Sequence, residues 1–294
     1  MTRIKANGIE IEYETFGKKG DPALLLIMGL GAQLTLWPES LCEGFAAHGF
    51  HVVRYDNRDV GLSTDFDKWG VPNIMEAFMK LMKGEKVATP YLLDDLANDA
   101  IGLLDALDID RAHMVGASMG GMIAQILAAK FPQRTRSLVS IMSTSGRRGL
   151  PMGKPEAVAM LSAQPEGPAR EQLITHAIKL RTVIGSPGFP SDSAELRALV
   201  ERNIDRRYYP AGAARQYLAV MASGDRVDLL KTVKVPTLVL HGDDDPLLPV
   251  DGGRDVASLV PGARIETFPG WGHDVPKQMV PKLVESISKF CKAA

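Results

Sequence analysis

The chain of 294 residues carries 34 basic and 35 acidic side chains, a formal net charge of −1, and 45% hydrophobic residues. A balance this even argues against a nucleic-acid partner and against a polybasic membrane-surface protein. Two cysteines are too few for a disulfide framework and show no metal-ligand spacing. The first residues lack a signal-peptide pattern, and no apolar run approaches the roughly 20 residues of a membrane span, so the cytosol is the expected compartment.

The N-terminal part of the chain predicts strands. Residues 3–16 alternate apolar and polar side chains around Asn7-Gly8, a dipeptide that favours a two-residue turn, so we expect a β-hairpin. The continuous apolar runs ALLLIM (23–28) and HVVRY (51–55) are typical of strands buried on both faces of a parallel sheet.

Predicted helices and strands then alternate along most of the chain. In chain order the further predicted elements are a helix at 38–48, a helix at 94–107, a strand at 112–116, a buried helix at 119–131, a strand at 136–142, a strand at 236–242, a helix near 251–259, a strand at 264–268 and a helix from about 276 to 291. This alternation implies βαβ crossovers. The fold class is therefore α/β, with a mostly parallel sheet flanked by helices.

One long segment interrupts the alternation. Residues 146–225 have helical periodicity only, and we interpret them as a helical cap inserted over one end of the sheet. The α/β core would then comprise 1–145 and 226–294. Several apolar residues of the cap suggest an apolar access route, namely Met160, Leu161 and Ile184.

The most informative motif is the G-x-S-x-G pentapeptide centred on Ser118. The pentapeptide alone is a weak signal in a chain with 28 glycines. Here it follows a predicted strand and opens a predicted helix, which is the arrangement of a nucleophile elbow. We therefore predict that Ser118 is a nucleophile; the alternative is a passive serine in a glycine-rich turn.

A serine hydroxyl needs a base within hydrogen-bond reach. Of the six histidines, His273 lies in the loop PGWGHDVP between the last predicted strand and the last helix. Loops after the strands of an open α/β sheet gather at the edge where ligands bind. We predict that His273 is the base, the alternative being a histidine that caps the final helix. His241, at a strand end, is expected to be a structural contact beside the acid.

The base needs a carboxylate to orient it, and three adjacent aspartates follow the strand at 236–242. Asp245 is the predicted acid because Pro246 biases it to an extended conformation, whereas Asp243 and Asp244 are expected to cap the turn. The resulting chain order is Ser, Asp, His.

A tetrahedral oxyanion requires preorganised N–H donors. The backbone amide of Met119 is predicted to supply one, and that of Leu30, in the turn MGLGAQ, the other. The alternative for that turn is an ordinary tight turn. Trp37 follows it, with two roles left open: lining the acyl pocket as a substrate-binding residue, or core packing.

Over essentially its whole length, the chain resembles the serine-esterase branch of the α/β-hydrolase superfamily. The motifs that carry the resemblance are MGLGAQLTLWP, VVRYDNRDVGLS, HMVGASMGG, LVLHGDDDPLLP and FPGWGHDVP. It is most similar to the aclacinomycin methylesterase group, which also has MG where many relatives have HG. The resemblance implies a triad of Ser118, Asp245 and His273, with Leu30 and Met119 as oxyanion donors. In DNRDVGLS it implies a turn that braces the oxyanion loop.

The expected function is that of a serine carboxylesterase. It would hydrolyse small to medium apolar esters through an acyl-enzyme intermediate, with a small-molecule ester as its partner and with no metal or organic cofactor. The alternatives are a lactonase, C–C hydrolase or perhydrolase with the same triad, or a low-turnover small-molecule receptor. The sequence leaves the physiological ester and the oligomeric state open.

Overall fold

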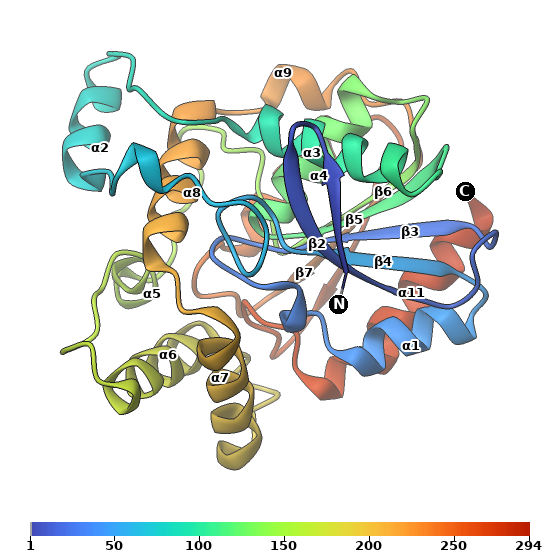
Figure 1. Ribbon diagram of the computed structural model, residues 1–294. Coiled ribbons are helices and arrows are strands. Elements are labelled where there is room, and N and C mark those ends of the chain that lie inside the picture. Colours follow the sequence, from blue (N-terminus) through green and yellow to red (C-terminus); the bar gives the residue numbers. More distant parts are fainter. Residues whose placement is uncertain (1) are drawn as a thin grey trace.

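A computed structural model describes residues 2–294, and within them the strands form one eight-stranded sheet (Figure 1). The strand order is β1-β2-β4-β3-β5-β6-β7-β8. β1 and β2 pair antiparallel with their neighbours, and all strands from β4 to β8 run parallel. The strands are β1 (Thr2–Ala6), β2 (Ile9–Phe16), β3 (Ala23–Ile27), β4 (His51–Tyr55), β5 (Ala112–Ala117), β6 (Thr135–Ile141), β7 (Thr237–Gly242) and β8 (Arg264–Phe268).

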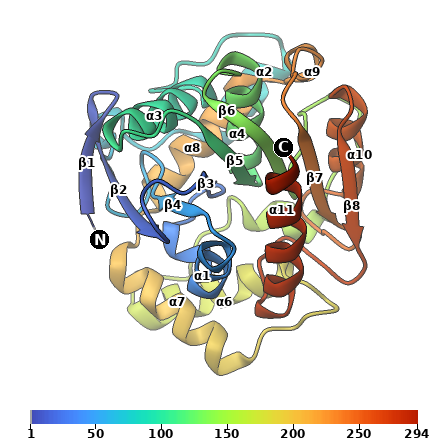
Figure 2. The same ribbon diagram turned by 90° about the vertical axis from the view of Figure 1, so that its right-hand side faces the viewer.

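Helices cover both faces of the sheet. In Figure 2, α1 and α11 lie on one face, and α3, α4 and α10 lie on the other. The helices are α1 (Glu39–Ala47), α2 (Ile74–Met82), α3 (Leu93–Ala106), α4 (Met119–Lys130), α5 (Pro155–Met160), α6 (Arg170–Ile184), α7 (Ser193–Arg207), α8 (Pro210–Ser223), α9 (Val227–Leu230), α10 (Val250–Leu259) and α11 (Val280–Ala293). No helix within residues 2–294 is long and apolar enough to cross a membrane.

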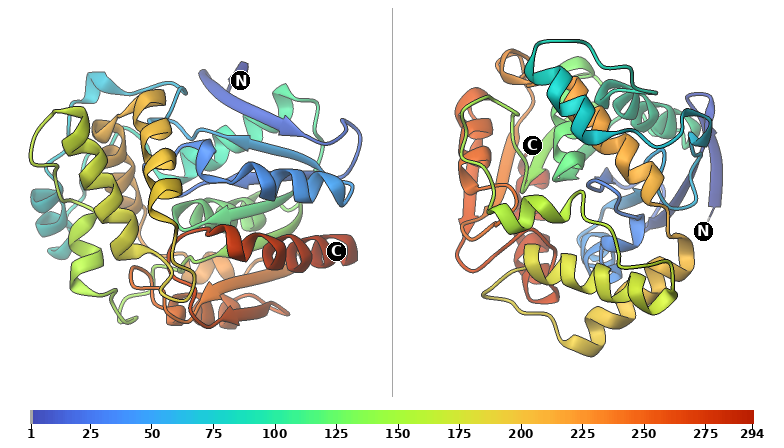
Figure 3. Two further views of the ribbon diagram at one scale, coloured as in Figure 1. Left: turned by 90° about the horizontal axis from the view of Figure 1, so that it is seen from below. Right: turned by 90° about the vertical axis from the view of Figure 1, so that its left-hand side faces the viewer.

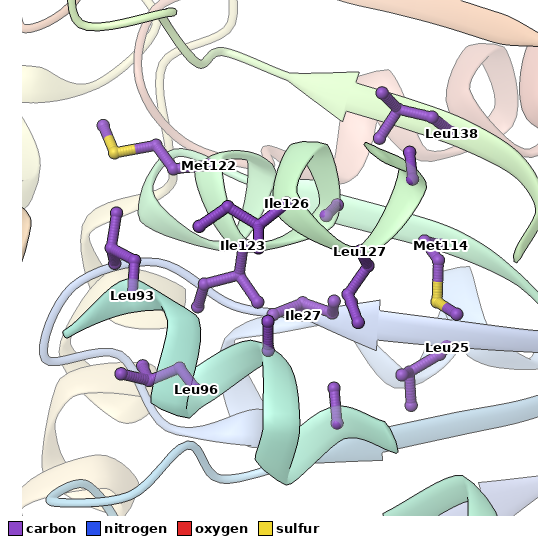
Figure 4. Close-up of a cluster of buried hydrophobic side chains, with 14 of the residues drawn as sticks. Leu25, Ile27, Leu93, Leu96, Met114, Met122, Ile123, Ile126, Leu127 and Leu138 are labelled. Atoms are coloured by element: carbon purple, nitrogen blue, oxygen red, sulfur yellow. The ribbon is translucent and has the colours of Figure 1, made fainter. Parts of the chain in front are cut away.

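The alternation of side chains along each buried strand divides the core into two clusters. On β3, Leu25 and Ile27 face α3 and α4, whereas Leu24 and Leu26 face α1 and α11. Figure 4 shows the first cluster, in which Ile123 and Leu127 of α4 lie over β3 and β5. A strand buried on both faces needs apolar residues at every position, which explains the unbroken apolar run at 23–28.

The predicted α/β class is confirmed, and the N-terminal hairpin is present. Asn7 and Gly8 both have positive φ, 47° and 78°, as a two-residue turn of the mirror-image type requires. The helix expected at 38–48 begins at Glu39, with Pro38 as its N-cap. The structure adds α2, which the sequence pattern did not predict and which leaves several apolar side chains exposed, namely Met75, Phe78, Met79 and Met82.

Between β6 and β7 the chain forms the short helix α9 and, before it, helices α5 to α8 (Figure 3). Helices α5 to α8 lie over the ends of β3, β5 and β6, because one cavity is lined by residues from both parts. Gln33, after β3, fastens the two together: its amide nitrogen donates to the carbonyl oxygens of Asn203 and Arg207 on α7, at 2.7 and 2.9 Å.

Candidate active site

Ser118 occupies a sharp turn between β5 and α4. Its φ of 57° and ψ of −120° are unusual for a residue with a side chain, and this backbone strain lifts the hydroxyl out of the sheet. The flanking glycines make the turn possible. A Cβ atom at Gly116 would lie 2.1 Å from the carbonyl oxygen of Gly120, and one at Gly120 would lie 2.0 Å from that of Ile27. Only glycine permits so close an approach of strand and helix.

The structure brings Ser118, His273 and Asp245 together from three separate loops. Nε2 of His273 lies 2.9 Å from Oγ of Ser118, and Nδ1 lies 2.7 Å from Oδ2 of Asp245. The loop of His273 is held by its backbone amide, which donates to the carbonyl oxygen of Ile184 on α6 at 2.8 Å. These distances form one continuous hydrogen-bonded chain from hydroxyl to imidazole to carboxylate.

Asp245 is buried and fully bonded. Its Oδ1 accepts from the backbone amides of Leu247 and Leu248, both at 2.9 Å, and its Oδ2 faces His273. Burial alone would raise the pKa of this carboxyl. The charge and hydrogen bond of His273, together with the nearby imidazole of His241, outweigh burial and hold the pKa of Asp245 below its ordinary value. The carboxyl is therefore a carboxylate at neutral pH.

The two neighbouring aspartates lie away from the imidazole. Asp244 accepts from the backbone amide of Gly270 at 2.7 Å, which fastens the strand-end turn to the loop before His273. Asp243 lies 3.9 Å from Arg254. Of the three acids, the structure therefore brings only Asp245 to the histidine.

Leu30 and Met119 line the same cavity as Ser118. Neither backbone amide has a hydrogen-bond partner within the described part of the chain. Gly29 brings the loop close: a Cβ atom there would lie 3.6 Å from Oγ of Ser118. Two unpaired N–H groups next to a nucleophile can stabilise a developing oxyanion.

The loop that carries Leu30 is braced from both the core and the cap. The carboxylate of Asp56 accepts from the backbone amide of Leu34 at 2.7 Å, and Asn57 donates to the carbonyl oxygen of Met28 at 3.0 Å. Gln216, on α8, accepts from the amide of Gly31 at 2.8 Å. Gln216 lies 185 residues from Gly31 in the chain, and no local pattern could have identified it.

A cavity of about 480 Å³ opens over Ser118 and His273, and most of its wall is apolar. Its apolar residues come from the sheet edge and from the cap helices, and they include Met28, Leu36, Met119, Met122, Met142, Leu161, Leu180, Ile184, Leu196, Leu199, Val220, Leu247 and Val275. Trp37 is fully buried in the core beneath and does not line the cavity. Of the two roles left open for Trp37, the structure therefore shows core packing, which corrects its assignment as a substrate-binding residue.

Neither cysteine competes with the serine as a nucleophile. Burial raises the pKa of the Cys42 thiol and of the Cys291 thiol to about 12, so both stay protonated at neutral pH. Within residues 2–294, no group of three or more His, Cys, Asp or Glu side chains is placed to hold a metal ion.

Comparison with known proteins finds the same fold family in sequence and in structure. The sequence model of the family described as alpha/beta hydrolase fold matches residues 22–277. The rhodomycin D methylesterase DauP of Streptomyces sp. (strain C5) is 28% identical, over 99% of this chain and 98% of its own. The 3-oxoadipate enol-lactonase 2 of Acinetobacter baylyi is 25% identical, over 90% of this chain and 87% of its own. A thermophilic esterase from Thermogutta terrifontis has a TM-score of 0.74 at 24% identity, with 100% of this chain and 99% of that one covered.

Proposed function

Because this chain belongs to the α/β-hydrolase family, we propose that it is a carboxylic-ester hydrolase that uses Ser118 as its nucleophile. The observation that carries the proposal is the hydrogen-bonded chain from Ser118 through His273 to Asp245. This hydrogen-bonded chain supports the proposal because a serine nucleophile needs a histidine base within hydrogen-bond reach and a carboxylate that orients the histidine.

In the acylation step, Oγ of Ser118 attacks the ester carbonyl carbon while Nε2 of His273 takes the hydroxyl proton. Asp245 accepts the hydrogen bond from Nδ1 and stabilises the imidazolium that forms. The carbonyl oxygen becomes an oxyanion, which the amides of Leu30 and Met119 stabilise. The imidazolium then protonates the alkoxide oxygen, and the alcohol leaves.

In the deacylation step, a water molecule takes the place of the alcohol. His273 removes a proton from this water, the resulting hydroxide attacks the acyl-enzyme, and the acid leaves as Oγ of Ser118 regains its proton. The same two amides serve both tetrahedral intermediates. The transfers between Ser118 and His273 use groups that already lie 2.9 Å apart.

The cavity favours small to medium esters with apolar groups next to the ester bond. Its volume of about 480 Å³ and its many Met and Leu side chains suit such a ligand. Similarity to a methylesterase agrees with ester cleavage, and similarity to an enol-lactonase makes lactone hydrolysis by the same triad the second candidate.

The cap and the compartment are further parts of the proposal. Residues 146–225 would form a cap that gates the cavity and sets the size of the ester, since α6 and α7 contribute much of its wall. The cytosol remains the proposed compartment, supported by two buried cysteines that form no disulfide.

The test is a panel of aryl esters of increasing acyl length and of lactones of increasing ring size, run beside Ser118→Ala. The proposal expects ester turnover that falls by at least about 10³-fold in Ser118→Ala, while the variant still binds a non-hydrolysable analogue. Lactone turnover above ester turnover would favour the second candidate. Binding with negligible turnover of every substrate would instead indicate a receptor.

A further inference from the structure

The cavity contains a cationic side chain that the ester mechanism does not use. Arg181 lies in the last turn of α6 and lines the cavity. It stands one helical turn before Ile184, whose carbonyl oxygen accepts from the amide of His273. Arg181 is therefore held next to the catalytic loop by the backbone of its own helix.

The guanidinium of Arg181 has no partner in the described part of the chain. No carboxylate oxygen lies within 4.0 Å of it, and it makes no side-chain hydrogen bond. Its nitrogens nevertheless remain accessible, since none belongs to the buried atoms that lack a partner. Burial lowers the pKa of Arg181 from its ordinary value, as expected for a cation with too little compensating charge.

Asp274 is the acidic group that most affects Arg181, but its carboxylate is engaged elsewhere. One of its oxygens accepts from the hydroxyl of Ser186, and its backbone carbonyl accepts from the indole of Trp271 at 2.7 Å. At the mouth of the cavity, Lys277 and Glu195 neutralise each other at 2.6 Å. Arg202, on α7, also lines the cavity without a salt-bridge partner, but its side chain is exposed. Arg181 is thus the partly buried cation of the cavity wall that has no partner within residues 2–294, and it lies beside the loop of His273.

We propose that Arg181 binds a carboxylate of the substrate, so that the preferred ester carries an acidic group in addition to the ester bond. This inference rests on the proposed function and narrows its substrate class from apolar esters to esters with an apolar spacer and one anionic end. A planar guanidinium binds a carboxylate through two parallel hydrogen bonds, and an apolar surrounding strengthens that interaction.

The test compares two series of substrates. The first contains monomethyl esters of straight-chain dicarboxylic acids with four to ten carbons, each paired with its ω-carboxamide, which has the same shape and no charge. The second contains acetate esters of ω-hydroxy acids, again paired with their carboxamides, so that the two series distinguish an acid on the acyl side from one on the alcohol side. At the best length, kcat/KM should be about 10- to 100-fold higher for the carboxylate than for the carboxamide, the effect of one charge-assisted interaction.

Three variants assign the preference to this side chain. Arg181→Met should remove the difference in kcat/KM between carboxylate and carboxamide, and Arg181→Lys should keep part of that difference. The matched control is Lys179→Gln, which removes a positive charge from an exposed position on the same helix and should leave the preference intact. As a readout independent of turnover, a free dicarboxylate of the best length should bind Ser118→Ala and lose at least about 10-fold in affinity when Arg181→Met is added.

Equal kcat/KM for carboxylate and carboxamide at every length in both series, measured on the unaltered protein, would overturn the inference. A preference that survives Arg181→Met would overturn it as well. In either case, retained hydrolysis of the carboxamide esters would show that the proposed esterase function stands. Loss of the proposed function would appear differently, as the absence of turnover of every ester.

Discussion

A second histidine flanks the carboxylate of the site: Nε2 of His241 lies 3.5 Å from Oδ2 of Asp245. The same nitrogen lies 2.8 Å from the carbonyl oxygen of Leu248, which can only accept, so Nε2 carries the proton. His241 is fully buried, and it lowers the pKa of Asp245 together with His273. Asp245 therefore has a second histidine beside its carboxylate, and this histidine makes no hydrogen bond to Ser118.

Replacement of this second histidine should weaken the enzyme moderately. His241→Leu removes an N–H group that bonds the carbonyl oxygen of Leu248 and lies 3.5 Å from Oδ2 of Asp245, so kcat/KM for a neutral aryl ester should fall about 5- to 30-fold. His241→Gln, which keeps a donor, should lose less. Steady-state kinetics with circular dichroism as the fold control measures both. An unchanged rate in a folded His241→Leu would contradict a positioning role.

The three adjacent aspartates should differ sharply in their contribution to catalysis. Asp245→Asn should lower kcat by about 10³- to 10⁴-fold, because a neutral amide neither orients the imidazole nor stabilises its charge. Asp244→Asn should cost far less, since this carboxylate holds only the backbone amide of Gly270. Asp243→Asn should be nearly neutral. Kinetics of the three single variants tests this order, and a larger loss at Asp243 or Asp244 would refute the assignment of the acid.

The activity should be lost on acidification through protonation of the base. Asp245, with its lowered pKa, stays charged down to well below pH 5. The acidic limb of kcat/KM therefore belongs to a histidine, a side chain that ordinarily titrates near pH 6.5. For a neutral ester, kcat/KM should fall on acidification below neutral pH with a slope of one proton. A rate that is constant from pH 8 to 5, with the fold intact, would exclude a histidine base.

A different histidine should make the stability of the fold depend on pH. His113 is buried with Nδ1 2.8 Å from Oγ of Ser137, and burial, helped by the charges of Arg136 and Arg111, lowers its pKa to about 4. The unfolded chain, with an ordinary pKa near 6.5, binds this proton first. Stability is then fully present above pH 6.5 and falls as the pH drops toward 4.

The size of this effect follows from the two pKa values. Between pH 7 and 5, His113 should account for a loss of about 2 kcal/mol in the free energy of unfolding. His113→Asn, which does not titrate, should show a correspondingly flatter dependence in urea unfolding at the two pH values. Equal pH dependence of the variant and the unaltered protein would show that His113 is not the responsible group.

Much of the fold and of the site follows from local sequence. The strand before Ser118 and the helix after it are both specified by short apolar runs, and the glycines between them are required by contacts below 3 Å. Parallel strands bring their carboxyl ends to one edge, so loops more than 100 residues apart, those of Ser118 and His273, could be predicted to meet. Pro246 is also a local signal, because a proline biases the preceding residue, here Asp245, to an extended conformation.

The parts that could not be predicted depend on contacts between distant segments. Gln216 and Arg181 lie on helices whose own sequence gives no sign that one braces the oxyanion loop and the other lines the cavity. Trp37 follows the oxyanion loop closely, and only the packing of α1 and α11 shows that its ring lies in the core. The sequence did not predict helix α2, because the apolar residues of this helix stay exposed and do not form a buried stripe.

The identity of the nucleophile is the central claim, and a fluorophosphonate probe tests it most directly. The probe should label one residue, Ser118, as located by peptide mass, and the fraction labelled should equal the fraction of esterase activity lost. Asp243→Asn serves as a control that should label at the normal rate, whereas His273→Ala should label far more slowly because the serine loses its base. Label at another residue, or full ester hydrolysis by Ser118→Ala, would contradict the account.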